Sequence, residues 1–269
     1  MNLFERIVDS LKFEMETPKP FGWFHLICIM LMLIAIIFLY KKRNSYSDKQ
    51  LKLVLGVYGI TALILEIIKQ VIWSFEFDSI TNTGVWDYTW YAAPFQLCTT
   101  PIYVSIICLF LKKGKIRDSL LSYMAFTTIL GSFMTIILPE SCFCRTTLVN
   151  IHTMWLHLGS FVVSIYLLMT KEVEIKKHNL IKGLIVFLIF VGIAMYLNIV
   201  IYNLGILNGE TFNMFYISPY FTSHLPVYET VQKSVPYLIY LLFYIFTIFM
   251  GSLIVYYIAN FTNRIRKNR

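Results

Sequence analysis

The stretch from Phe21 to Arg43, FGWFHLICIMLMLIAIIFLYKKR, decides the fold class of this protein. Its apolar run over residues 22–40 has about the length of the roughly 20 residues that an α-helix needs to cross a bilayer. A segment of mixed charge precedes the run, and no small-residue cleavage site follows it before the basic residues 41–43. We therefore expect a retained transmembrane helix rather than a cleaved signal peptide.

The composition agrees with a membrane protein. Hydrophobic residues make up 58% of the 269 residues and charged residues only 14%, against roughly 25% charged in soluble domains. The net charge of +8 comes from short basic segments between apolar runs, where basic residues orient helices and meet anionic head groups. We therefore do not expect nucleic acid as a partner.

Six further apolar runs predict six further spans. They cover residues 51–74, 93–111, 118–138, 150–170, 180–204 and 235–259. The expected fold is all-α: one polytopic membrane bundle of seven transmembrane helices over residues 21–269. Residues 1–20 precede it as an amphipathic segment, with apolar residues at helical spacing that suit the outer membrane surface.

The basic residues predict the orientation of the bundle. Lys and Arg gather after the first, third, fifth and seventh spans, in KKRNSYSDKQLK, KKGKIRD, KEVEIKKH and NRIRKNR, whereas the other connections are neutral or acidic. Because basic loops stay in the cytoplasm, we expect the N-terminus outside and the C-terminus in the cytoplasm of a multi-pass cell-membrane protein.

Polar residues inside the spans fall into one layer near their outer ends, on a rise of about 1.5 Å per residue. The residues of this layer are His25, Glu66, Lys69, Gln70, Cys98, His157 and Asn198. Gly59, Ala62 and Glu66 share one helix face, and His157, Ser160 and Ser164 share another. Because lipid cannot satisfy polar groups, both faces are predicted to look inward onto a polar cavity.

Some of these residues have two interpretations. Glu66 and Lys69, one helical turn apart, suit a compensating ion pair, which either fastens helices together or lines a cavity for water or a head group. For Gln96 and Asn198, hydrogen bonding between helices is the default role.

Cys98 is the candidate nucleophile. A lone buried cysteine usually behaves as a small hydrophobe, but His157, at similar depth, could take the thiol proton and stabilise the thiolate. His152 lies about 140° from His157 around the helix, so the two are poor joint metal ligands. No HExxH or CxxC pattern is present, and we expect no metal, no other cofactor and no obligatory disulfide between Cys142 and Cys144.

Several short motifs resemble a known family. PFQLC at 94–98 resembles the PxHLC signature of the YwaF-type bacterial integral membrane proteins, which are related to an animal transmembrane phospholipid acyltransferase. FGWFHL at 21–26, LEIIKQ at 65–70, HLG at 157–159 and NMFYISP at 213–219 fit in order. The resemblance implies a cysteine-dependent acyltransferase acting on membrane phospholipid or lysophospholipid, with Cys98 and His157 at the catalytic positions. Gln96 replaces the family's histidine.

Supporting roles follow from this hypothesis. Gln96 and Asn198 would donate to an oxyanion, Glu66 would orient the histidine, and Lys69 would meet the phosphate. The remaining supporting or substrate-binding candidates are His25, Gln70 and Asn213.

Two other classes of function stay open. A transporter or small-ligand receptor could use the same polar cavity, and a scaffold would need it for stability alone. A retinal protein is improbable, because the last span contains no lysine. The sequence does not determine the oligomeric state.

Overall fold

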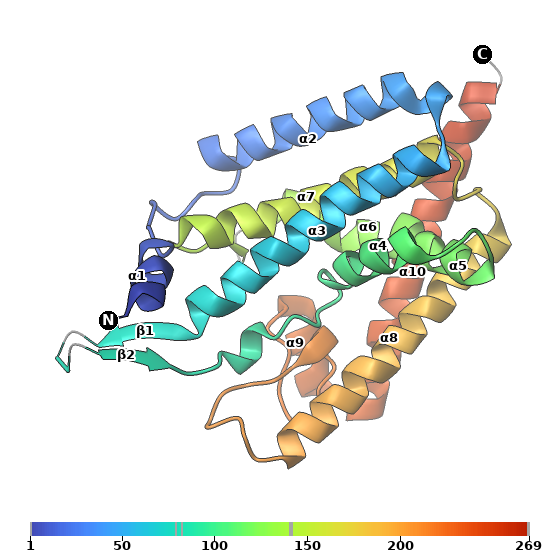
Figure 1. Cartoon of the computed structure of the whole chain (residues 1–269). Coiled ribbons are helices and arrows are strands. Elements are labelled where there is room, and N and C mark those ends of the chain that lie inside the picture. The colour runs from blue at the N-terminus through green and yellow to red at the C-terminus, as the bar shows by residue number, and fades with distance from the viewer. Residues whose placement is uncertain (1, 79, 82, 140–141, 268–269) are drawn as a thin grey trace.

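Six helices among the described residues are long and apolar enough to cross a membrane (Figure 1). The computed structural model describes residues 2–78, 80–81, 83–139 and 142–267. The six are α2 (Trp23–Lys42), α3 (Asp48–Trp73), the continuous helix of α5 (Lys115–Tyr123), η3 (Met124–Thr128) and α6 (Ile129–Ile137), α7 (Thr147–Met169), α8 (Lys177–Asn203) and α10 (Tyr237–Lys267). Part of the acidic connection expected after the fourth span and the end of the basic C-terminal segment lie outside the described residues.

The third predicted span is shorter than expected. Only α4 (Thr100–Phe110), of 11 residues, is helical there, and residues 93–99 are non-helical, with a turn over 97–99. The expectation of one helix over 93–111 is therefore wrong. Pro101 occupies the first turn of α4, and proline disfavours the helical conformation for the residue before it and lacks an N–H donor.

The remaining elements cover one end of the bundle. They are α1 (Leu3–Ser10), β1 (Phe75–Asp78), β2 (Thr83–Trp86), the short helices η2 (Trp90–Ala92) and η5 (Met214–Tyr216), and α9 (Pro226–Ser234). A capping box between Asn2 and Glu5 starts α1, and the Phe4 ring stacks on Trp86 at 5.7 Å. The antiparallel β1–β2 hairpin occupies the connection that the sequence predicts only as a loop.

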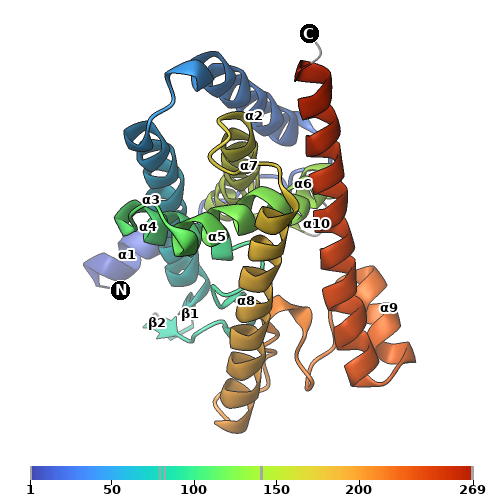
Figure 2. The ribbon, with the colours of Figure 1, turned by 90° about the vertical axis from the view of Figure 1, so that its right-hand side faces the viewer.

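The two ends of the bundle differ in character. At the end that we call the hairpin end, Figure 1 shows α1, the β-hairpin, α9 and the N-terminal end of α2, and Figure 2 shows the β-hairpin and α9 at the level of the lower halves of α8 and α10. The basic residues 41–43 and the α7–α8 connection lie at the opposite end, which we call the basic end. The helices α2, α7 and α10 run from the hairpin end towards the basic end, and α3, the α5–η3–α6 helix and α8 run the opposite way (Figure 1).

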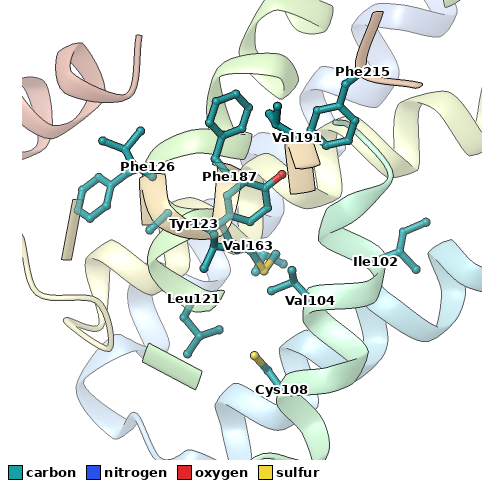
Figure 3. Packing of buried hydrophobic residues seen from close by; sticks show 14 of the residues in the cluster. Ile102, Val104, Cys108, Leu121, Tyr123, Phe126, Val163, Phe187, Val191 and Phe215 are labelled. Carbon is teal, nitrogen blue, oxygen red and sulfur yellow. The ribbon is translucent and has the colours of Figure 1, made fainter. Parts of the chain in front are cut away.

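The core is built around α4, the α5–η3–α6 helix, α7 and α8. Figure 3 shows Tyr123, Phe126, Phe187 and Cys108 within it, and each is almost completely buried. The π-helical segment η3 widens the helix at this point, and the Ser164 hydroxyl of α7 donates to the carbonyl of Met124 at 2.8 Å. The spacing in the sequence places Gly59, Ala62, Glu66, Lys69, Gln70 and Trp73 on one face of α3 and Thr153, His157, Ser160 and Ser164 on one face of α7. Of these residues, Gly59, Ala62, Glu66, His157, Ser160 and Ser164 are buried, whereas Lys69, Gln70, Trp73 and Thr153 are half-buried.

Gly183 marks the closest approach of α8 to α5. A Cβ atom there would lie 2.8 Å from the Ser122 carbonyl oxygen and 2.9 Å from its carbon. Because these are backbone atoms, Gly183→Ala is expected to lower the free energy of unfolding by about 1–3 kcal/mol. Gly192→Ala, in the same helix with open space around it, is the control. Equal unfolding transitions in detergent for the two variants would contradict the prediction.

Candidate functional site

Cys98 lies in the turn that leads into α4. The Thr99 hydroxyl accepts from the Gln96 N–H at 2.8 Å and donates to the Gln96 carbonyl at 2.9 Å, and the Thr100 hydroxyl donates to the Leu97 carbonyl at 2.8 Å. Non-helical backbone at membrane depth is tolerated where protein groups satisfy it. The polar residues at the entrance of the third span therefore build a turn, and Cys98 is half-buried within it.

The segment that carries Cys98 is tied to α3. The Ala92 carbonyl accepts from Gln70 Nε2 at 2.7 Å and from Lys69 Nζ at 3.4 Å. The backbone N–H of Trp90 donates to Glu210 at 2.8 Å. These bonds fix the segment against the C-terminal turns of α3 and against the connection that follows α8.

Glu66 is the centre of a buried polar cluster, which we define as Glu66, Lys69, Gln70 and His152. One carboxylate oxygen contacts Lys69 Nζ at 2.7 Å and accepts from Gln70 Nε2 at 2.7 Å. The other lies 2.8 Å from His152 Nε2. Only 2% of Glu66 is exposed, so this carboxylate depends on protein partners for the solvation it has lost.

The partner of Glu66 is His152 rather than His157. His157 is buried one and a half turns further along α7, and its Nδ1 atom has no hydrogen-bond partner. Among the described residues, no hydrogen bond joins Cys98 to either histidine. His157 does lie within electrostatic range of His152, so the two imidazoles belong to one region.

Several ionisable groups lie near Cys98, among them Lys69, Glu66 and Tyr58. Lys69 and Glu66 lie within electrostatic range of the thiol, and so does the Tyr58 hydroxyl. Tyr58 donates to the carbonyl of Leu156 at 3.1 Å, the residue before His157. Tyr58 therefore connects the surroundings of Cys98 to the stretch of α7 that carries His157.

His25 lies apart from the polar cluster. It is fully buried, and its Nδ1 accepts from the Phe21 N–H at 3.1 Å. Its ring meets Phe143 edge to face at 5.7 Å, while Nε2 is buried without a hydrogen-bond partner. His25 thus closes the N-terminal end of α2 against the loop before α7.

Gln96, Asn198 and Asn213 hold a buried loop. Gln96 donates to the Asn213 carbonyl at 2.9 Å and accepts from the Phe215 N–H at 2.7 Å. Asn198 donates to the Met214 carbonyl at 3.0 Å and accepts from the Met214 N–H at 2.7 Å. Asn213 accepts from the Ser218 N–H at 2.8 Å. Three side-chain amides therefore fasten the 213–218 segment beside Cys98.

This loop is strained. Phe215 and Tyr216 both have positive φ, 58° and 60°, and non-glycine residues rarely adopt that conformation. Such strain persists only where the surroundings hold it in place and is concentrated at functional sites. The hydrogen bonds between the Gln96 and Asn198 side-chain amides and the loop backbone hold the loop in this conformation.

The sequence reasoning missed His152 and the loop-binding role of the amides. The spacing does not predict a role for His152, because it lies off the helix face that carries His157. In the structure α7 packs against α2, α3, α6 and η3, so several faces of α7 are buried. No group of three or more His, Cys, Asp or Glu side chains among the described residues is arranged to hold a metal ion.

Comparison with protein-family models gives one match. Residues 17–256 match the model described as the TMEM164 family. This range includes the polar cluster, Cys98 and the 213–218 loop. Searches of the curated proteins and of the solved structures each return no match.

Proposed function

Because this chain belongs to the TMEM164 family of transmembrane proteins, we propose that it is a cysteine-dependent acyltransferase that moves acyl chains between phospholipids of the cell membrane. The observation that carries the proposal is the setting of Cys98. Cys98 is a half-buried residue at a break before a short apolar helix, within electrostatic range of the buried Glu66–Lys69 pair. The resemblance of residues 94–98 to the YwaF-type signature supports the same role.

The first half of the reaction forms a thioester. His157 takes the Cys98 proton, and the thiolate attacks the ester carbonyl carbon of a phospholipid. The carbon–sulfur bond forms, the ester carbon–oxygen bond breaks, and the departing lysophospholipid oxygen receives the proton back from His157. In this scheme the Glu66 carboxylate, which His152 contacts, offsets the positive charge that His157 carries in between.

In the second half of the reaction, the thioester transfers its acyl chain to a second lysophospholipid. The hydroxyl of a second lysophospholipid gives its proton to His157 and attacks the thioester, and the thiolate leaves with the electron pair of the carbon–sulfur bond. The second N–H of the Gln96 amide is the oxyanion donor in this scheme. Lys69 attracts the phosphate, while Gln70, Asn198, Asn213 and His25 position the surrounding backbone.

The proposed topology sets this chemistry in the outer leaflet. With the N-terminus outside and the C-terminus in the cytoplasm, the basic end faces the cytoplasm. In this arrangement α4 is a seventh, partial crossing, and the non-helical residues 93–99 complete it. The substrate ester then reaches Cys98 from the head-group layer at the hairpin end.

The test is to trap the thioester. Purified protein incubated with a phospholipid that carries an alkyne-tagged acyl chain is expected to gain the tag on Cys98 and to lose it with hydroxylamine. Cys98→Ala should abolish labelling, whereas Cys108→Ala removes a fully buried core thiol and should retain it. Absence of a Cys98 adduct in folded protein would overturn the proposal.

Histidine variants separate the two imidazoles within the same assay. His157→Ala is expected to slow adduct formation at least about a hundredfold, the usual scale for losing a general base. His152→Ala should slow it less, because it acts through charge, and exposed His178→Ala should leave it unchanged. Solute flux in proteoliposomes without lipid turnover would instead favour a transporter.

A further inference from the structure

A long apolar groove lies between α2, α3 and α7, away from the polar cluster. Its volume is about 1060 Å³, at the upper end of the roughly 300–1,000 Å³ typical of small-molecule sites. The groove extends over most of α2, from Trp23 to Lys42. It exists because α2 packs along α7 and α3 packs along both α7 and α4, so that α2 and α3 diverge.

The walls of the groove suit hydrocarbon. Leu31 and Phe38 of α2 and Leu53 of α3 line it and are more than half exposed, although they lie at membrane depth. Met154 and Leu158 form its floor on α7. A ligand here must therefore be apolar along most of its length and must enter from the lipid phase.

The polar residues of the groove are unequally distributed. Lys42 is the one charged residue among the described residues that line it, and it has no ion-pair partner among them. Ser45 and Gln50 lie at the same basic end, and Gln50 Oε1 is buried without a hydrogen-bond partner. At the hairpin end the lining residues Met15, Trp23 and Thr147 carry no charge.

We infer that this groove is a binding site for an anionic phospholipid of the cytoplasmic leaflet. The phosphate pairs with Lys42, the glycerol region meets Ser45 and Gln50, and one acyl chain runs along α7 between α2 and α3. The single cationic end fixes the orientation of the lipid. An unpaired amide oxygen next to it gives a hydroxylated head group a hydrogen-bond acceptor.

This lipid is not positioned for the proposed acyl transfer. The Tyr58 ring lies between the groove and the region of Cys98, packed so closely on α7 that a Cβ on Gly159 would lie 2.7 Å from it. The phosphate end lies at the basic end, remote from the thiol. The site is therefore a resident lipid site, and its occupancy does not depend on Cys98.

The experiment uses full-length protein in detergent with a phosphatidylglycerol that carries a photoreactive diazirine in its acyl chain. Crosslinks are expected on α2 between Cys28 and Leu39 and on α7 between Ile151 and Val163. Ala35→Trp, which fills the groove, should lower this labelling by at least about fivefold. Ile37→Trp, on an exposed position of α2 outside the lining, should change it by less than about twofold.

The head-group assignment is tested by competition with unlabelled phosphatidylglycerol and phosphatidylcholine. Lys42→Ala should abolish the preference for the anionic lipid, and the neighbouring Lys41→Ala should keep it. Labelling spread equally over the exposed face of α10, or equal effects of the two tryptophan variants, would show annular lipid only and overturn the inference.

If Ala35→Trp fails to fold, the crosslink positions in the wild-type protein still show whether the lipid occupies the groove. Cys98→Ala should bind the lipid in the groove like the wild-type protein. Failure of the acyltransferase proposal would therefore leave the result of this lipid-binding experiment unchanged.

Discussion

Replacing Glu66 by alanine is expected to lower the free energy of unfolding by about 3–5 kcal/mol, the scale measured for breaking a buried ion pair. The carboxylate contacts Lys69, Gln70 and His152 at 2.7, 2.7 and 2.8 Å. Its loss leaves the Lys69 ammonium, whose side chain is only 11% exposed, without a counter-charge. Denaturant-induced unfolding in mixed micelles, followed by helicity, measures the change.

Matched variants show whether charge is the cause. Glu76→Ala removes an exposed carboxylate of β1 and should change stability little. The double variant Glu66→Ala, Lys69→Ala removes both charges and should recover part of the loss, giving a coupling energy between the two positions. If Glu66→Ala unfolds like Glu76→Ala, the cluster does not stabilise the hairpin end. The proposed support of His157 by Glu66 would then lose its structural basis.

Hydropathy predicted the long helices well because the bilayer imposes one length and one composition on them. The run over 93–111 was misjudged for a physical reason. Its apolar content fits a span, but Pro101 prevents the helix from extending towards Gln96, and hydroxyls satisfy the turn instead. A hydropathy average cannot distinguish such turns from a helix, because it carries no information on which backbone groups are hydrogen-bonded to each other.

The candidate site was predicted in part for a similar reason. Helical spacing identified the inward faces of α3 and α7 and the Glu66–Lys69 pair. It could not identify the Glu66–His152 contact, because that depends on how α7 is rotated against α3. The amides of Gln96 and Asn198 were expected at an oxyanion, yet both bind the backbone of the 213–218 loop. Loop placement far along the chain is not encoded in local spacing.

Arg117→Ala is expected to lower the free energy of unfolding by about 3–5 kcal/mol as well, because it breaks a buried ion pair at the opposite end of the bundle. Arg117 is 1% exposed, and its Nη2 atom lies 2.6 Å from Asp48 and 3.0 Å from Glu172. Tyr46 donates its hydroxyl to Glu172. The arginine therefore joins the start of α3, the start of α5 and the α7–α8 connection. The truncation leaves the Glu172 carboxylate, which is only 10% exposed, with the exposed Lys113 at 3.8 Å as its remaining cation.

The variants that accompany Arg117→Ala separate geometry from charge. Arg117→Lys keeps the charge but lacks the planar guanidinium whose Nη2 atom meets both carboxylates, so an intermediate loss is expected. Adding Glu172→Gln to Arg117→Ala removes the stranded charge and should recover stability. Lys115→Ala, on an exposed position of the same helical turn, is the control. Because buried charges are weakly screened, the loss should persist in high salt; a loss that disappears there would assign Arg117 to surface electrostatics instead.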